Sequence, residues 1–200
     1  MNAEAVMDLE STEPVAGSHE LTPGKVGMWV FLVTDALSFG GLLIGYASLR
    51  AWSPVWPVPS TVLDIPLTAF NTFLLICSSV SMVLAVASAE AQDRKGVIRY
   101  LAATIACGAG FLGIQAYEYH HLFSTGLSLS SSLFGATFFT LTGFHGAHVT
   151  SGVLYLSGLL AGVLAGKFVG PHESHIEIAG LFWHFVDLIW ILIFTFVYLV

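Results

Sequence analysis

Charge is what this sequence has least of. Only 10% of its 200 residues are Asp, Glu, Lys or Arg, against roughly 25% in an average soluble domain. Hydrophobic residues make up 56% of the chain, and its mean hydropathy is +0.81. The six Lys and Arg residues are too few to build a basic face for nucleic acid. The composition therefore excludes a soluble monomer, a disordered chain and a nucleic-acid-binding protein.

Cysteine is equally scarce. The sequence contains only Cys77 and Cys107, and both lie inside apolar runs. There is no Cys-x-x-Cys pair and no disulfide framework, so we interpret both as small hydrophobic residues. The glycine loops that bind phosphate and the Gly-x-Ser-x-Gly turn of hydrolases are also missing from any strand–turn–helix context. Nucleotide chemistry and serine-nucleophile chemistry are therefore not supported.

Long apolar runs are what the sequence does have. A bilayer core of ~30 Å requires about 20 helical residues, and a backbone inside lipid has to satisfy its own hydrogen bonds. Five runs are long enough: residues 26–49, 65–89, 97–121, 133–164 and 177–199. The sequence therefore predicts an all-α, polytopic membrane protein, a bundle of five transmembrane helices.

The chain is expected to divide into a tail and one membrane domain. Residues 1–22 are acidic, polar and without periodicity, and we expect them to form a flexible N-terminal tail. Residues 23–200 are expected to form the five-helix domain.

Positive charge predicts the orientation of this domain. If each run crosses the membrane once, five of the six basic residues share one side, and only Arg50 lies on the other. The five are Lys25, Arg94, Lys95, Arg99 and Lys167. Basic residues are enriched on the cytoplasmic side of membrane proteins. We therefore expect a cytoplasmic N-terminus and a C-terminus outside.

Glycines spaced by four residues could bring helices close together. Gly41 and Gly45 form one such pair, and Gly158, Gly162 and Gly166 form a longer series. Small residues at this spacing allow close helix approach. The alternative is that glycine is simply common in membrane helices.

Ionisable groups at membrane depth are the candidate functional residues. Asp35 lies near the middle of the first run, His145 and His148 of the fourth, and His184 and Asp187 of the fifth. Such groups are expensive in lipid and are expected to face protein, water or each other. We expect these three helices to turn them toward one another. Proton transfer, lipid-headgroup binding and purely structural hydrogen bonding are the three interpretations.

The third run carries a further polar pair. Gln115 and Glu118 are three residues apart, so a helix places them on one face. They are expected nearer the outer side than the other groups.

A metal centre finds little support, although the chain has eight histidines. His145 and His148 share one helix face, and Glu118-Tyr-His-His121 is a Glu-x-x-His motif. A helical di-iron site requires a second such motif, which is missing. The histidine spacings of membrane desaturases do not occur either. We therefore expect no metal, no cofactor and no catalytic residue on this chain.

Five stretches together resemble the cytochrome c oxidase subunit III family. They span about 25–200 in the family's order and are Gly27–Leu42, Asn71–Ser79, Gln115-Ala-Tyr-Glu-Tyr119, Phe134–Val149 and Trp183-His-Phe-Val-Asp-Leu-Ile-Trp190. Glu177 also matches a glutamate of the family. Two departures are visible. The family's long form has seven helices, whereas this chain lacks the first two, and Thr34-Asp35 stands where the family usually has Ser-Glu.

The resemblance implies an accessory role. A subunit III of a haem–copper oxidase carries no redox centre, packs against catalytic subunit I beside subunit II, binds phospholipid, and supports proton uptake and enzyme lifetime. Haem and copper are then expected on the partner subunits, in a bacterial cytoplasmic membrane. A small subunit in place of the missing helices and membership of a respiratory supercomplex are compatible with it. The alternatives are an accessory protein of a nitric oxide reductase and a free-standing membrane metalloenzyme. The electron donor, cytochrome c or quinol, is left open.

Overall fold

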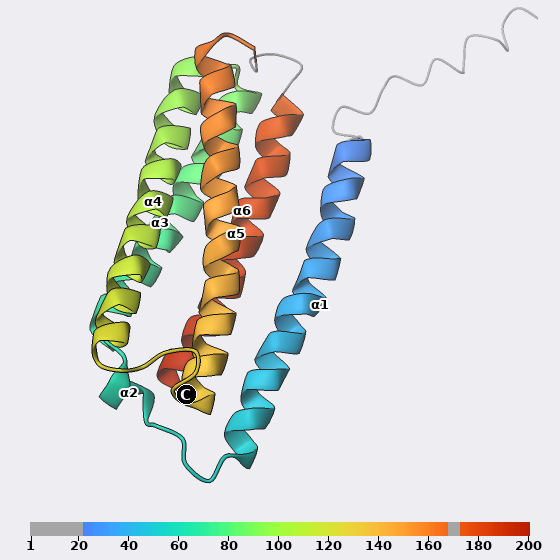
Figure 1. Cartoon of the computed structure of the whole chain (residues 1–200). Helices are drawn as coiled ribbons and strands as arrows, with labels where there is room; N and C mark the ends of the chain where they lie inside the picture. The colour runs from blue at the N-terminus through green and yellow to red at the C-terminus, as the bar shows by residue number, and fades with distance from the viewer. Residues whose placement is uncertain (1–21, 168–172) are drawn as a thin grey trace, which may run out of the picture.

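The protein is a bundle of long helices (Figure 1). The computed structural model describes residues 22–167 and 173–200, and within them five helices are long and apolar enough to cross a membrane. They are α1 (Pro23–Trp52), α3 (Ile65–Glu90), α4 (Arg94–Ser124), α5 (Leu133–Leu164) and α6 (Glu173–Ile193), which continues as the π-helical segment η2 (Phe194–Leu199). The predicted all-α, five-helix membrane fold is confirmed. The expected tail, apart from Thr22, lies outside the described residues.

Capping residues decide where the helices begin. The side chains of Thr22, Asp64, Asp93 and Ser132 each accept a hydrogen bond from a backbone N–H of the first turn. Those N–H groups have no partner inside the helix, and a cap satisfies one of them. For this reason α1 and α4 each begin three residues before the apolar run that predicts them.

The proline-rich connection after α1 is not a continuous helix. It contains only the short helix α2 (Pro59–Val62). Trp52 is 88% exposed, whereas the ring of Trp56 packs edge-on against Tyr46 and Phe134, with centroids 5.4 and 5.6 Å apart. Of these two tryptophans, only Trp52 is exposed, as expected of an aromatic residue at the membrane interface.

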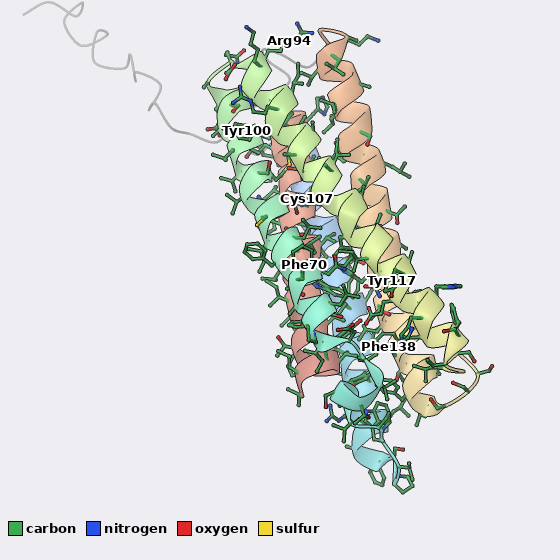
Figure 2. The ribbon with its side chains drawn as sticks, turned by 90° about the vertical axis from the view of Figure 1, so that its left-hand side faces the viewer. Phe70, Arg94, Tyr100, Cys107, Tyr117 and Phe138 are labelled. Carbon is green, nitrogen blue, oxygen red and sulfur yellow. The ribbon has the colours of Figure 1, made fainter. Side chains whose placement is uncertain are left out.

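Helix α1 lies at the periphery of the bundle (Figure 1). Helices α3 and α4 form an antiparallel pair, and α5 and α6 complete the core around them. The most apolar 18-residue window of α1 is 17% buried, against 50% for the last span, His175–Leu199. Side chains such as Phe70, 57% exposed on α3, point away from the bundle (Figure 2). Such outward faces are suited to lipid or to neighbouring subunits.

The basic residues gather at one end of the bundle. The start of α1, the α3–α4 turn, the end of α5 and the start of α6 all lie there (Figure 1). Arg94 marks this end, and Phe138 lies toward the opposite one (Figure 2). The Arg94 guanidinium donates hydrogen bonds to the carbonyls of Val163 and Leu164, at 3.1 and 2.8 Å. It thereby gives a partner to the Leu164 carbonyl where α5 ends, and adds a second donor to the Val163 carbonyl, which already accepts from the backbone N–H of Gly166.

Of the two interpretations of the glycine spacing, close helix approach is not seen within this chain at Gly41, Gly45 or Gly158, where a Cβ would meet nothing within 4 Å. Two of the tightest approaches between helices are at Gly108 of α4 and Gly152 of α5. A Cβ at these two positions would lie 2.6 and 2.9 Å from the ring of Trp183. The two glycines form a notch that holds a tryptophan of α6.

Candidate functional site

Asp35 and His148 form a polar link between α1 and α5. Oδ1 of Asp35 lies 3.3 Å from Nε2 of His148. Nδ1 of His148 is 2.8 Å from the carbonyl oxygen of Phe144, which can only accept, so Nδ1 carries a hydrogen. Asp35 and His148 therefore join α1 to α5 through a polar contact in a largely buried place.

The Asp35–His148 pair lies largely buried within the protein. Asp35 is 7% exposed, and its Oδ2 atom has no hydrogen-bond partner among the described residues. The ring of Phe39, one turn further along α1, packs against His148 at 5.1 Å between centroids. A buried carboxyl oxygen without a protein partner is expected to bond to an ordered water.

His184 is directed to a different helix. Its Nδ1 atom lies 2.7 Å from Oγ of Ser79 on α3. Asp187, one turn further along α6, is 5% exposed, and neither of its carboxyl oxygens has a partner in the described part of the chain. Within that part, the five groups expected to meet therefore form no single hydrogen-bonded cluster. Asp35 pairs with His148, and His184 pairs with Ser79.

His145 is enclosed by aromatic rings. It is completely buried and stacks on Trp190 at 4.9 Å between centroids, with the edge of Phe111 at 5.7 Å. Neither ring nitrogen has a hydrogen-bond partner among the described residues. Although His145 and His148 are one turn apart, they occupy different surroundings.

Glu118 is the centre of a second polar cluster, toward the end of the bundle opposite the basic residues. Its carboxyl oxygens accept hydrogen bonds from Thr68 Oγ1 at 3.3 Å, Gln115 Nε2 at 3.3 Å and Tyr198 OH at 3.1 Å. The predicted shared face of Gln115 and Glu118 is confirmed. The cluster joins α3, α4 and η2, and it borders a cavity of about 320 Å³ that Asp64 and His121 also line.

Glu177 lies at the basic end of the bundle. Its Oε2 atom is 2.7 Å from Nζ of Lys25, which links the start of α6 to the start of α1. The Glu177 side chain is 36% exposed. This contact is therefore a surface ion pair, separate from the buried groups.

Hydroxyl groups are the partners that sequence reasoning missed. Ser79, Thr68 and Tyr198 hold His184 and Glu118, and the indole N–H of Trp190 donates to Thr72 Oγ1 at 2.9 Å. Ionisable residues at membrane depth stand out in a sequence, whereas neutral hydroxyls do not. A signal was present, because buried polar residues of α3 recur at helical spacing on one face. These are Thr68, Asn71, Thr72 and Ser78.

Metal ligation is not supported by the geometry. Within residues 22–167 and 173–200, no three His, Cys, Asp or Glu side chains converge as metal ligands.

Comparison with known proteins settles the family. The family described as "Cytochrome c oxidase subunit III" matches residues 6–200. This chain belongs to the cytochrome c oxidase subunit III family. It is 36% identical over 196 residues to cytochrome c oxidase subunit 3 of Corynebacterium diphtheriae, covering 96% of each chain. It is also 34% identical over 173 residues to cytochrome bo(3) ubiquinol oxidase subunit 3 of Pseudomonas aeruginosa, covering 86% of this chain and 83% of that one.

Quinol oxidases appear again among the relatives. The quinol oxidase subunit 3 of Bacillus subtilis is 35% identical over 174 residues, covering 87% of this chain and 85% of its own length. Subunit III proteins named for either electron donor are thus similar to this chain to nearly the same degree.

In this structure, the stretches that resemble the subunit III family mostly contribute packing contacts between helices. Trp183 of the last stretch fills the notch at Gly108 and Gly152 and donates its indole N–H to Ser78 Oγ at 2.9 Å. Trp190 of the same stretch covers His145. Asp35 and His148 are different, because their side chains make a polar contact between two helices.

Proposed function

We propose that this subunit III chain is the accessory, non-redox subunit of a respiratory haem–copper terminal oxidase, which reduces oxygen to water and translocates protons. The proposal rests on the family match over nearly the whole chain. The chain forms a bundle of helices able to cross a membrane, and its polar groups mainly join these helices. The catalytic centre, with haem and copper, belongs to partner subunits.

The partners are the catalytic subunit I and subunit II of the same oxidase. Their contact surface is drawn from the outward faces of the helices. Helix α1 offers the largest such face, with Trp29, Val33 and Leu37 each more than half exposed. A small subunit in place of the two helices that the long form has would cover α1, and a larger respiratory supercomplex is compatible with the same surfaces.

The location is a bacterial cytoplasmic membrane, with the basic end of the bundle inside. Five of the six Lys and Arg residues lie at that end, which supports a cytoplasmic start of α1 and an outer C-terminus.

Asp35 is proposed to contribute to proton handling. The support for this proposal is the contact of Asp35 with His148 at 3.3 Å and the buried Oδ2 of Asp35, which has no hydrogen-bond partner among the described residues. His184 and Asp187 form a second polar site on the α3 side. Glu118 and His145 serve the packing of the bundle, Glu177 ties α1 to α6 at the surface, and phospholipid is expected along the lipid-facing grooves.

Purification through a tag on this chain in mild detergent tests the proposal. A visible redox difference spectrum with haem bands and two larger co-purifying subunits would support it. Co-purification with a nitric oxide reductase in place of an oxidase would contradict it. So would a chain that comes alone with stoichiometric iron or copper.

A further inference from the structure

Two amide side chains near Glu118 each keep one acceptor oxygen without a donor. Nε2 of Gln115 donates to Glu118 Oε2 at 3.3 Å, and Nδ2 of Asn71 donates to the carbonyl oxygen of Phe111 at 3.3 Å. These bonds decide which amide atom is the nitrogen, because an amide oxygen in its place would face another acceptor. The other amide atoms, Gln115 Oε1 and Asn71 Oδ1, are buried and have no hydrogen-bond partner among the described residues.

The two amides lie in the same layer between α3 and α4. Thr68 of α3 bonds to Glu118 of α4, and Asn71, one turn further along α3, bonds to the carbonyl of Phe111. Because the two helices are antiparallel, Gln115 lies opposite the turn of α3 that carries Thr68 and Asn71. Asn71 is 1% exposed and Gln115 is 5% exposed. A side chain of a neighbouring subunit therefore has no access to these oxygens, and their partner has to be a small molecule.

A polar cavity connects this layer with the surface at the end of the bundle opposite the basic residues. Its volume of about 320 Å³ is far above the roughly 10–15 Å³ that one water molecule requires. Ser60 and Asp64, which line it, are exposed, whereas Glu118 in its wall is buried. Tyr117, another lining residue, lies in the half of α4 away from Arg94 (Figure 2). The cavity thus reaches from solvent to the carboxyl group that bonds to Gln115.

Water is the small molecule that fits these two oxygens. A water molecule has two O–H donors, and a buried one is held by two to four polar partners. The oxygens of Asn71 and Gln115 can accept both of its hydrogens. A metal ion fits less well, because no three His, Cys, Asp or Glu side chains converge in residues 22–167 and 173–200. Buried acceptors without a protein partner are usually satisfied by ordered water.

We propose that water fills the cavity at Glu118 and that one further water molecule binds between Asn71 and Gln115, where it bridges α3 and α4. Gln115 is one helical turn from Glu118, so hydration extends one turn deeper into the bundle than the cavity itself. The arrangement gives solvent a route to a buried carboxyl group of this subunit. It depends on side chains of this chain alone and not on the proposed oxidase role.

A structure of the purified complex in which ordered waters are resolved tests this site. Density for one water is expected within about 2.7–3.2 Å of both Asn71 Oδ1 and Gln115 Oε1, together with waters in the cavity. Waters resolved in the cavity but none between the two amides would overturn the proposal. A bound cation at the same place, coordinated by Glu118, would also overturn it. Either result would leave the proposed oxidase role intact, because the same structure shows the haem subunits.

One variant and a matched control assign the water to the amides. Asn71→Leu replaces the amide by an apolar group of similar size, and it is expected to lose the bridging water and keep those of the cavity. The control is Thr104→Val, because the Thr104 hydroxyl lies in the same α3–α4 contact but bonds to the carbonyls of Tyr100 and Ser78. This control should keep the bridging water. A bridging water that persists in Asn71→Leu would contradict the site, and if that variant does not assemble, the wild-type density alone decides.

Discussion

At the scale of single residues, Asp35 and His148 are the groups proposed above for proton handling. Nδ1 of His148 bonds to the carbonyl of Phe144, and its Nε2 lies 3.3 Å from Oδ1 of Asp35. A group that holds a proton at membrane depth is a candidate for proton handling. The same contact also joins the peripheral α1 to α5, and the two roles can be separated by substitution.

The variant Asp35→Asn separates the role in proton handling from the role in joining α1 to α5. The asparagine amide can donate to neutral Nε2 of His148, so the link between the helices is kept while the carboxyl proton is lost. We expect normal amounts of this chain in the purified complex, together with lower turnover or a shorter functional lifetime. The control is Thr34→Ala, because the Thr34 hydroxyl bonds only to carbonyls of its own helix. Loss of the subunit from the Asn variant would show a structural link, and unchanged assembly, turnover and lifetime would leave Asp35 without a role.

Substitution of Gly108 should disturb the packing of α4 against α6. A Cβ there would lie 2.6 Å from the Trp183 ring, and the ring cannot easily move because its N–H is bonded to Ser78. Gly108→Ala is expected to destabilise the protein by about 1–3 kcal/mol, seen as a lower Tm of the purified complex. Gly113→Ala on the same helix, where a Cβ meets nothing, should leave Tm unchanged or raise it. Equal Tm values for the two variants would contradict the notch.

At the scale of the elements, the end of the chain is held by a side chain of another helix. Tyr198 of η2 donates to the Glu118 carboxyl of α4 at 3.1 Å, and its ring is buried against Phe138 at 5.7 Å between centroids. The last turns are π-helical, with a wider backbone pattern than the rest of α6. We infer that the bond to Glu118 fixes the position of this segment.

Tyr198→Phe tests that inference. The variant keeps the ring and removes one donor from Glu118, so the free energy of unfolding should fall by about 1–3 kcal/mol. Faster amide hydrogen exchange should appear in residues 194–199, measured by mass spectrometry. Tyr155→Phe is the matched control, because that tyrosine is 41% exposed on the lipid-facing surface. Exchange in 194–199 that rises equally in both variants would argue against the role of the hydroxyl.

The helices themselves could be predicted from the sequence, whereas their contacts could not. Apolar length alone identifies five spans, and capping by Thr22 and Asp93 explains why two of them begin earlier than the apolar runs. The rotation of each helix about its axis is set by three-dimensional packing. For this reason spacing suggested Gly41 and Gly45 as contact points, while the structure uses Gly108 and Gly152.

The candidate site, like the helices, could be predicted from the sequence only in part. The polar residues at membrane depth could be named, but their partners could not. The hydroxyl of Ser79 gives no strong signal in a sequence, because serine is also common in membrane helices as a packing residue.

At the scale of the whole molecule, the distribution of charge predicts the topology. With the basic end inside, the turn between α4 and α5 lies outside the cell. Ser130, exposed in this turn, offers a position for a label, and Lys95 offers one at the basic end. In a background without Cys77 and Cys107, Ser130→Cys should react with an impermeant maleimide in intact cells, and Lys95→Cys only after lysis. The reverse pattern would invert the proposed orientation.

The accessory role of this chain is tested most directly by comparing the oxidase with and without it. The oxidase would be purified from wild-type cells and from cells that lack this subunit. Haem and copper per subunit I, initial turnover, and the number of turnovers before inactivation would then be measured. If the chain has an accessory role, the oxidase that lacks it should have unchanged haem and copper, substantial initial turnover and a shorter functional lifetime. Loss of haem or copper in proportion to the missing chain would contradict it, because the redox centre would then depend on residues of this subunit.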